Sequence, residues 1–190
     1  MNVAGQPMRT IWPAADGAAV EIIDQTRLPH ALVVVRLETV ADAAQAIRAM
    51  LVRGAPLIGA TAAWGIWLAL RVDPAEASLA RAHALLLATR PTAVNLRWAL
   101  DRCRAQLAPL APERRAAAAR QLAEIICDED VALNRGIAAA GLPLLAAIAR
   151  RKGDGATVNV LTHCNAGWLA TVDVGPATAP IYAAQAAGVS

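Results

Sequence analysis

A cysteine between a histidine and an asparagine is the part of this sequence best suited to chemistry. Residues 161–167 read LTHCNAG, and the run 156–160, rich in strand-forming residues, precedes them. Open α/β sheets place ligands and reactive groups at the carboxyl ends of their strands. Backbone N–H groups of a turn after Cys164 could stabilise its thiolate or a bound phosphate. We therefore predict that Cys164 is catalytic. Because adjacent strand residues point to opposite faces, we expect His163 to be structural.

Other chemistries for the cysteines fail on spacing. In phosphatases that use a cysteine and an arginine six residues later, that arginine binds phosphate, but here the position is Ala170. A zinc site would need a second ligand pair at the usual spacing, and the sequence has none. The three cysteines lack the paired spacing of a disulfide framework. Cys103 and Cys127 lie in apolar helical patterns and are expected in the core.

Two arginines stand just before predicted helix starts. Arg53 is followed by Gly54, Ala55 and a proline that suits a first helical turn, and Arg90 is likewise followed by a proline. Anions bind at helix N-termini, and a guanidinium adds charge there. Each site alone could be an ordinary helix cap or an exposed arginine. Two such sites in one chain favour a phosphorylated ligand.

The composition is that of a globular protein and excludes several classes. Hydrophobic residues make up 57% and charged residues 17% of the 190 residues, and the net charge is only +3. Scattered arginines and few aromatics give no case for nucleic-acid binding. The longest uncharged run, 54–70, is shorter than the ~20 residues that a membrane span needs, so we expect a buried core helix. Residues 1–10 lack a signal-peptide pattern, which makes a cytoplasmic setting the expectation.

The elements that must position these residues fall into two groups. Short strands are expected near 9–12, 20–23 and 32–35, as a small antiparallel sheet. Helices are expected over about 42–52, 56–70, 74–89, 91–103 and 112–139, with Pro143 interrupting or restarting the last. After the Gly153–Gly155 turn, a strand at 156–161 and a helix near 176–187 follow.

The predicted fold class is α/β with an α+β start. Residues 1–152 would form the antiparallel sheet and a mostly helical domain, and 153–190 the first strand–helix unit of an incomplete Rossmann-like domain. One parallel strand cannot make a sheet, because its hydrogen-bonding edges stay unpaired. We therefore expect the front part of a larger protein.

Three segments together resemble the methylthioribose-1-phosphate isomerase family. They are 50–60 (MLVRGAPLIGA), 90–96 (RPTAVNL) and 161–167 (LTHCNAG), in the family's order and roughly its spacing, and 20–26 (VEIIDQT) fits its opening strands. The resemblance implies conversion of 5-methylthioribose 1-phosphate to 5-methylthioribulose 1-phosphate in methionine salvage. It implies that Cys164 is one member of an acid/base pair. It also implies that Arg53, Gly54, Ala55 and Arg90 contact the substrate.

The same resemblance implies a second acid/base group that this chain lacks. In the family it is an aspartate of the C-terminal domain, and the sequence here ends at Ser190; Asp173 is not its substitute. The pattern also departs from the family at 174–176 (VGP). We therefore predict that the 190-residue chain is inactive alone. The family forms homodimers, and no cofactor, metal, nucleic acid or membrane is implied.

Other functions remain open at this point. Isomerases of ribose 1,5-bisphosphate or 5-deoxyribose 1-phosphate share the cysteine and the arginine motif. A second phosphate would need more cationic groups, whereas a methylthio group needs apolar walls, which Trp64, Trp67 and Trp168 favour. Regulatory subunits of a translation-initiation guanine-exchange factor share the fold without catalysis. A fragment with no function of its own is the last alternative.

Overall fold

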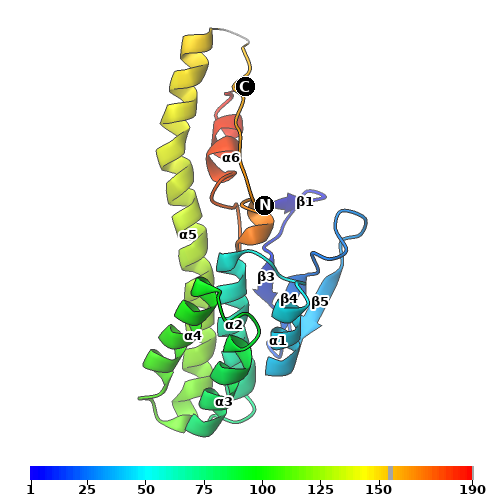
Figure 1. Ribbon diagram of the computed structural model, residues 1–190, viewed down its shortest axis with the longest axis vertical. Coiled ribbons are helices and arrows are strands. Elements are labelled where there is room, and N and C mark those ends of the chain that lie inside the picture. Colours follow the sequence, from blue (N-terminus) through cyan, green and yellow to red (C-terminus); the bar gives the residue numbers. More distant parts are fainter. Residues whose placement is uncertain (154–155, 190) are drawn as a thin grey trace.

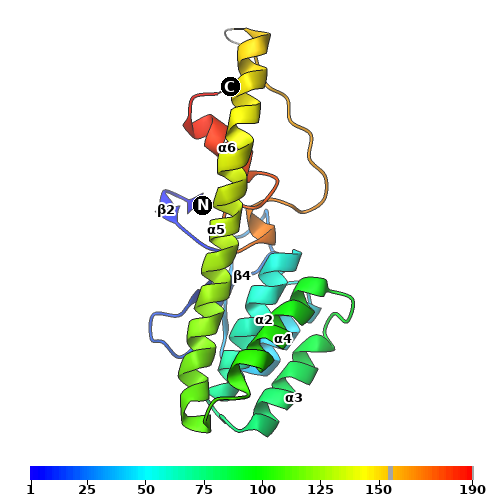
Figure 2. The same ribbon diagram turned by 90° about the vertical axis from the view of Figure 1, so that its left-hand side faces the viewer.

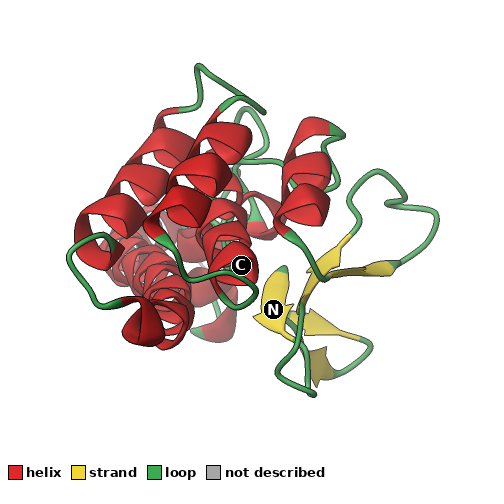
Figure 3. Ribbon diagram, turned by 90° about the horizontal axis from the view of Figure 1, so that it is seen from below, coloured by secondary structure: helices red, strands yellow, loops and turns green. Residues whose placement is uncertain are grey.

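The computed structural model describes residues 1–153 and 156–189. Helices gather on one side of the molecule and the strands on the other (Figure 3). A helical bundle lies at one end, and one long helix extends far beyond it (Figure 1). The elements are β1 (Asn2–Val3), β2 (Gln6–Pro7), β3 (Ile11–Pro13), β4 (Val20–Ile23), β5 (Val34–Leu37), α1 (Val40–Arg48), α2 (Ala55–Leu70), α3 (Glu76–Leu87), α4 (Val94–Leu107), α5 (Pro112–Lys152), the short 3-10 helix η1 (Trp168–Ala170) and α6 (Ala179–Ala186).

The predicted N-terminal antiparallel sheet is confirmed. Strands β3, β4 and β5 pair in that order, with Ile11 opposite Ile22 and Val20 opposite Leu37. These four side chains are fully buried, because alternate residues of each strand face the helices. A separate two-stranded hairpin, β1–β2, precedes the sheet.

Helix α2 is the centre of the core. Fourteen of its 16 residues are buried, and α1, α3, α4 and α5 all pack against it. Such a helix is apolar on every face because every face meets protein. The uncharged run 54–70 is thus the buried core helix that the sequence predicts.

Helix α5 differs from the prediction because Pro143 does not interrupt it. The helix runs unbroken for 41 residues. Pro143 and Ala139 are both exposed, so the carbonyl that loses its N–H partner can turn to water. The first half of α5 packs in the bundle, and the second half extends away from it and carries α6 (Figure 2). By length and composition alone α5 could cross a membrane, and one such helix is weak evidence for a membrane span.

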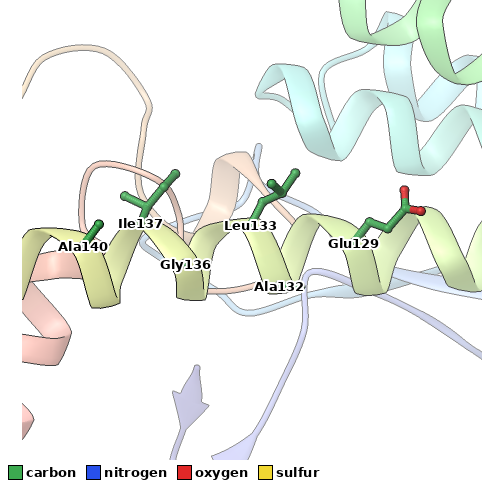
Figure 4. A pocket seen from close by; sticks show the side chains of 6 residues that line it. All are labelled: Glu129, Ala132, Leu133, Gly136, Ile137 and Ala140. Atoms are coloured by element: carbon green, nitrogen blue, oxygen red, sulfur yellow. The ribbon is translucent and has the colours of Figure 1, made fainter.

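An exposed apolar face runs along the middle of α5. Leu133 and Ile137 keep 69% and 42% of their surface exposed. Figure 4 shows both, with Ala140, projecting from the same side of the helix into a shallow hollow that Glu129, Ala132 and Gly136 also line. Helical spacing explains this face, since residues three and four apart share one side of a helix.

The strand predicted at 156–161 is wrong for this structure. Residues 156–163 form no regular secondary structure and are mostly exposed, and Leu161 is 97% exposed. In the described part of the chain no neighbouring strand lies beside them, so a ladder of hydrogen bonds has no partner. Val158 and Val160 instead flank a groove of about 370 Å³ with α5 and α6. Helix α6 is real but shorter than expected.

Candidate functional site

A pocket of about 410 Å³ lies where the starts of α2 and α4 meet the middle of α5. The pocket therefore joins these two helix starts. Helix α2 begins two residues after Arg53, whereas α4 begins at Val94, three residues later than the start predicted after Arg90. The close approach depends on Gly59, because a Cβ there would lie 3.0 Å from the Asn95 carbonyl oxygen. The lining residues are Pro56, Gly59, Val94, Asn95, Trp98, Ile126, Glu129, Asp130 and Leu133.

Both helix starts are open toward a ligand. The N-cap positions of α2 and α4 are Gly54 and Ala93, and neither makes a side-chain capping hydrogen bond. The first-turn N–H groups of each helix therefore keep their capacity to donate to an anion. Arg53 and Arg90 are exposed, and neither forms a salt bridge with any residue that the structure describes. We call these two helix starts, with Arg53 and Arg90 shortly before them in the chain, the rim of the pocket; neither arginine itself lines the pocket.

Gly54 connects this rim with the segment that follows Cys164. Its φ of +103° is a conformation that favours glycine. A Cβ at Gly54 would fall 2.4 Å from both Cα and the carbonyl oxygen of Ala170, the last residue of η1. Only glycine lets the two backbones meet this closely. The helix start and the cysteine-bearing segment are therefore in direct contact.

Cys164 itself is exposed and does not line the pocket. It adopts a φ of +70° in a turn, but no helix begins directly after it; η1 starts four residues later at Trp168. His163 is exposed as well. The helix starts after Arg53 and Arg90 thus meet at one pocket. The segment that follows Cys164 contacts the first of them, but the Cys164 thiol itself does not line the pocket.

The other two cysteines are core residues, as predicted. Burial raises the pKa of Cys103 and of Cys127 to about 12. The Cys127 sulfur accepts a hydrogen bond of 3.4 Å from the indole N–H of Trp64. Both thiols therefore stay protonated and shielded at neutral pH.

Three side chains that the sequence did not single out hold the segment after Cys164. Thr10 Oγ1 donates to the Thr171 carbonyl at 2.6 Å, and Gln25 Nε2 donates to the Leu169 carbonyl at 2.6 Å. Asp130 Oδ2 accepts from the Val172 N–H at 2.7 Å. These contacts join residues more than 40 positions apart, so no local pattern could reveal them.

Asp130 is the inward-facing member of a run of three acidic residues, 128–130, on the long helix. Its neighbours Asp128 and Glu129 face solvent, 65% and 47% exposed by side chain. Successive helical residues point about 100° apart, so the third residue turns inward. Burial raises the pKa of Asp130, and hydrogen bonds from the Val172 N–H and from Asn134 oppose that rise.

The tryptophans also need a correction. Trp64 and Trp67 pack edge to face in the core, with ring centroids 5.3 Å apart, and do not reach the pocket. Trp168 lies in η1 and likewise does not line it. The aromatic wall of the pocket is Trp98, with the Arg102 guanidinium 5.4 Å from its ring centroid. In the sequence, Trp98 stands alone near a helix start, and no pattern around it distinguishes a pocket-lining residue from an exposed one.

A long helix closing a helical bundle, with a small sheet beside it and a following segment docked on the bundle, defines the class of this chain. The initiation factor 2 subunit family matches residues 31–189, and the chain belongs to that family. Over its full length it is 58% identical to the methylthioribose-1-phosphate isomerase of Rhodospirillum rubrum, of which it covers 50%.

Solved structures agree. The 5-methylthioribose 1-phosphate isomerase of Pyrococcus horikoshii OT3 superposes with a TM-score of 0.84 and 34% identity, over 97% of this chain and 51% of that one. Translation initiation factor eIF-2B subunit delta from A. fulgidus gives a TM-score of 0.80 and 37% identity, over 96% of this chain and 52% of that one. The chain thus spans about half the length of the relatives it matches.

Proposed function

We propose that this chain is the N-terminal half of an isomerase that converts 5-methylthioribose 1-phosphate to 5-methylthioribulose 1-phosphate in methionine salvage. The carrying observation is the pocket that unites the two helix starts after Arg53 and Arg90, with the Cys164 segment docked against Gly54. The names of relatives at about 58% identity support the same reaction.

The rim of the pocket suits the phosphate ester. The N–H groups of Gly54 and Ala55, together with Arg53 and Arg90, supply donors and positive charge for a dianion. The pentose would then extend over the pocket between α2, α4 and α5. This assignment explains why the two arginine motifs stand at the same edge of the fold.

The reaction needs acid and base groups, and no oxidant. The bond between C1 and the ring oxygen breaks, a hydrogen passes from C2 to C1, and the C2 hydroxyl becomes a carbonyl while the C1 phosphate ester is retained. One group must protonate the ring oxygen as another removes a proton at C2. We assign Cys164 to one of these roles, and its partner to a carboxylate outside residues 1–190.

The walls of the pocket favour a methylthio group over a second phosphate. Val94, Trp98 and Leu133 are apolar, and the charged lining residues are the carboxylates Glu129 and Asp130. Carboxylates repel a second phosphate, whereas apolar walls stabilise a thioether. Ribose 1,5-bisphosphate is therefore disfavoured as a substrate. 5-Deoxyribose 1-phosphate remains the alternative.

The complete protein would require a second half that covers surfaces exposed here. We propose that residues 156–161 become the first strand of a Rossmann-like sheet when further strands pair with them. The apolar face of α5 around Leu133 and Ile137 adjoins the pocket, since Glu129 and Leu133 line both hollows. A second half on this face would exclude water from the reaction. We place the complete enzyme in the cytoplasm as a homodimer.

A regulatory role is the second candidate, favoured by the likeness to the A. fulgidus subunit. One experiment separates the two. The 190-residue chain is mixed with a polypeptide corresponding to the C-terminal half of the R. rubrum relative, and formation of 5-methylthioribulose 1-phosphate is measured. We expect turnover by the mixture, none by either part, and a loss of ~100- to 10,000-fold in Cys164→Ser, the range typical of a removed acid/base group.

The matched control is Cys103→Ala, which removes a buried thiol that does not line the pocket. A mixture that associates without turnover, or that works equally well with Cys164→Ser, would contradict the isomerase and favour the regulatory role. Turnover by the 190-residue chain alone would show that the second acid/base group lies within it.

A further inference from the structure

The segment that follows Cys164 is packed as one unit. The Ala177 N–H donates to the Ala166 carbonyl at 3.1 Å. Gly175, with φ +84°, lies so close to Gly167 that a Cβ would sit 2.1 Å from its carbonyl carbon. We call residues 166–178 the docked unit. Its position relative to the bundle determines where the cysteine just before it is presented.

Contacts from two sides hold the docked unit. From the N-terminal segment, Thr10 and Gln25 donate to its carbonyl groups, and the Met1 amino group pairs with Asp173. From α5, Asp130 Oδ2 accepts the Val172 N–H at 2.7 Å, and α6, which follows the docked unit in the chain, packs along the same helix. A carboxylate that accepts a backbone N–H forms a stronger hydrogen bond than a neutral pair does.

Asp130 is itself fixed in place. Its Oδ1 accepts from Asn134 Nδ2 at 3.2 Å, one helical turn further along α5, and Asn134 is 3% exposed. Both carboxylate oxygens are therefore engaged, one by the helix and one by the docked unit. Asp130 therefore fixes the docked unit relative to α5.

Asp130 also lines the 410 Å³ pocket, together with residues of the α2 and α4 starts. One side chain thus contacts both the wall of the proposed substrate pocket and the unit that follows Cys164. Thr10 and Gln25 do not line this pocket. Of these three side chains, Asp130 is the one that contacts both parts of the site.

We propose that Asp130 is a positioning residue that holds the docked unit, and with it Cys164, in register with the substrate pocket. The proposal deepens the proposed isomerase function and rests on it for its catalytic consequence. Asp130 has no assigned contact with reacting atoms, so it acts through Cys164. Small displacements of a catalytic group can reduce rates ~100-fold.

The test first measures position without activity. A nitroxide label on Cys164, whose companions Cys103 and Cys127 are buried, is paired with a second label on Arg97→Cys, an exposed position of α4. We expect a narrow distance distribution in the 190-residue chain and in Asp128→Asn. In Asp130→Ala the distribution should broaden, and hydrogen exchange at the Val172 amide should accelerate at least ~10-fold.

Asp130→Asn keeps one carbonyl oxygen and serves as the conservative variant if the alanine variant fails to fold. It should give an intermediate distribution. In the mixture with the C-terminal half, Asp130→Ala should lower kcat ~10-fold or more with little change in KM, and Asp130→Asn should restore part of kcat.

The outcomes separate the two proposals. Unchanged distance distribution and Val172 exchange in a folded Asp130→Ala or Asp130→Asn chain would overturn the positioning role, whatever the activity. If Cys164 is displaced in the Asp130 variants but kcat is unchanged, the catalytic role of Asp130 is overturned, while the proposed isomerase function stands. If the unsubstituted mixture does not turn over, the proposed function fails, and the distance distribution alone decides whether Asp130 holds Cys164.

Discussion

Gly54 and Ala170 meet backbone to backbone, and a Cβ on Gly54 would overlap the Cα of Ala170 at 2.4 Å. This contact joins the start of α2, with its neighbouring Arg53, to the segment that follows Cys164. Two sequence motifs separated by more than 100 residues thereby become parts of one site. The contact involves main chain on both sides, so side-chain rearrangement cannot relieve a substitution there.

Gly54→Ala should therefore be strongly destabilising. The change adds backbone strain at φ +103° and a steric clash with Ala170, and we expect the free energy of unfolding to fall by ~2 kcal/mol or more. Urea denaturation followed by circular dichroism measures this fall. The matched control is Gly136→Ala on α5, where a Cβ meets no atom within 4 Å. There alanine should be neutral or stabilise by up to ~1 kcal/mol. Equal stability of the two variants would refute the contact.

Much of the helical bundle could be predicted from the sequence, because its helices carry local signals. The 54–70 run is apolar on every side, which only burial explains, and Thr39 with Asp42 forms the capping box that starts α1. The length of helix α5 was harder to predict, because the helix continues through Pro143 only where solvent can reach the carbonyl of Ala139. Local sequence does not record that exposure.

The candidate site could be predicted from the sequence only in part. Arg53 and Arg90 each stand shortly before a helix start, a local pattern that the sequence shows, and their role in binding an anion stays a prediction. Asp130 instead depends on which side of α5 faces the docked unit, and Trp98 on how α4 lies against α2. Those are tertiary relationships. The predicted strand at 156–161 failed for the same reason, since strand formation depends on neighbours.

Removing either rim arginine should weaken substrate binding. In the mixture with a C-terminal half, Arg53→Ala and Arg90→Ala should each raise KM by ~10- to 100-fold, as expected when one charged hydrogen bond to phosphate is lost. Lysine at the same positions should recover part of the affinity, because it restores charge without the planar fork. Arg97→Ala, exposed on α4 outside the pocket lining, is the control. A KM shift as large in Arg97→Ala as in the rim variants would count against an anion site.

Thiol labelling should distinguish Cys164 from the other cysteines. Burial raises the pKa of Cys103 and Cys127 to about 12, so both remain protonated and unreactive at pH 8. Iodoacetamide should therefore modify Cys164 alone in the native chain and all three thiols in denaturant. Intact mass and peptide mapping give the count and the positions. Labelling of Cys127 in the native state would show that the core around Trp64 opens.

The Arg102–Glu129 pair predicts a pH effect beside the pocket. The Arg102 guanidinium, with Nη2 at 2.8 Å from Glu129 Oε1, lowers the pKa of that carboxyl. A lowered pKa in the folded state means that the pair stabilises the fold above the carboxyl's ordinary pKa, and that this contribution is lost as pH falls. Because the pair is largely exposed, the stabilisation should stay below ~1 kcal/mol.

Arg102→Ala should thus raise the pKa of Glu129 toward its ordinary value, as measured by carbon-13 NMR titration of the side-chain carboxyl. Arg104→Ala, in the last turn of the same helix, should leave it unchanged. If Glu129 titrates identically in the unsubstituted chain and in Arg102→Ala, the two side chains do not pair in solution.

Trp98 should determine which 5-substituent the pocket accepts. The ring forms part of an apolar wall with Val94 and Leu133, and Arg102 stacks over it at 5.4 Å. Trp98→Ala should lower kcat/KM for 5-methylthioribose 1-phosphate by ~10- to 100-fold, since lost apolar contact of this size is worth ~1–3 kcal/mol. The loss should be smaller for 5-deoxyribose 1-phosphate, which has no thioether to bury. Val72→Ala, 80% exposed and away from the pocket, is the control. An equal loss for both sugars would mean that Trp98 supports the fold of the site and does not contact the 5-substituent. Selection between the two substrates would then depend on residues of the second half that face this wall.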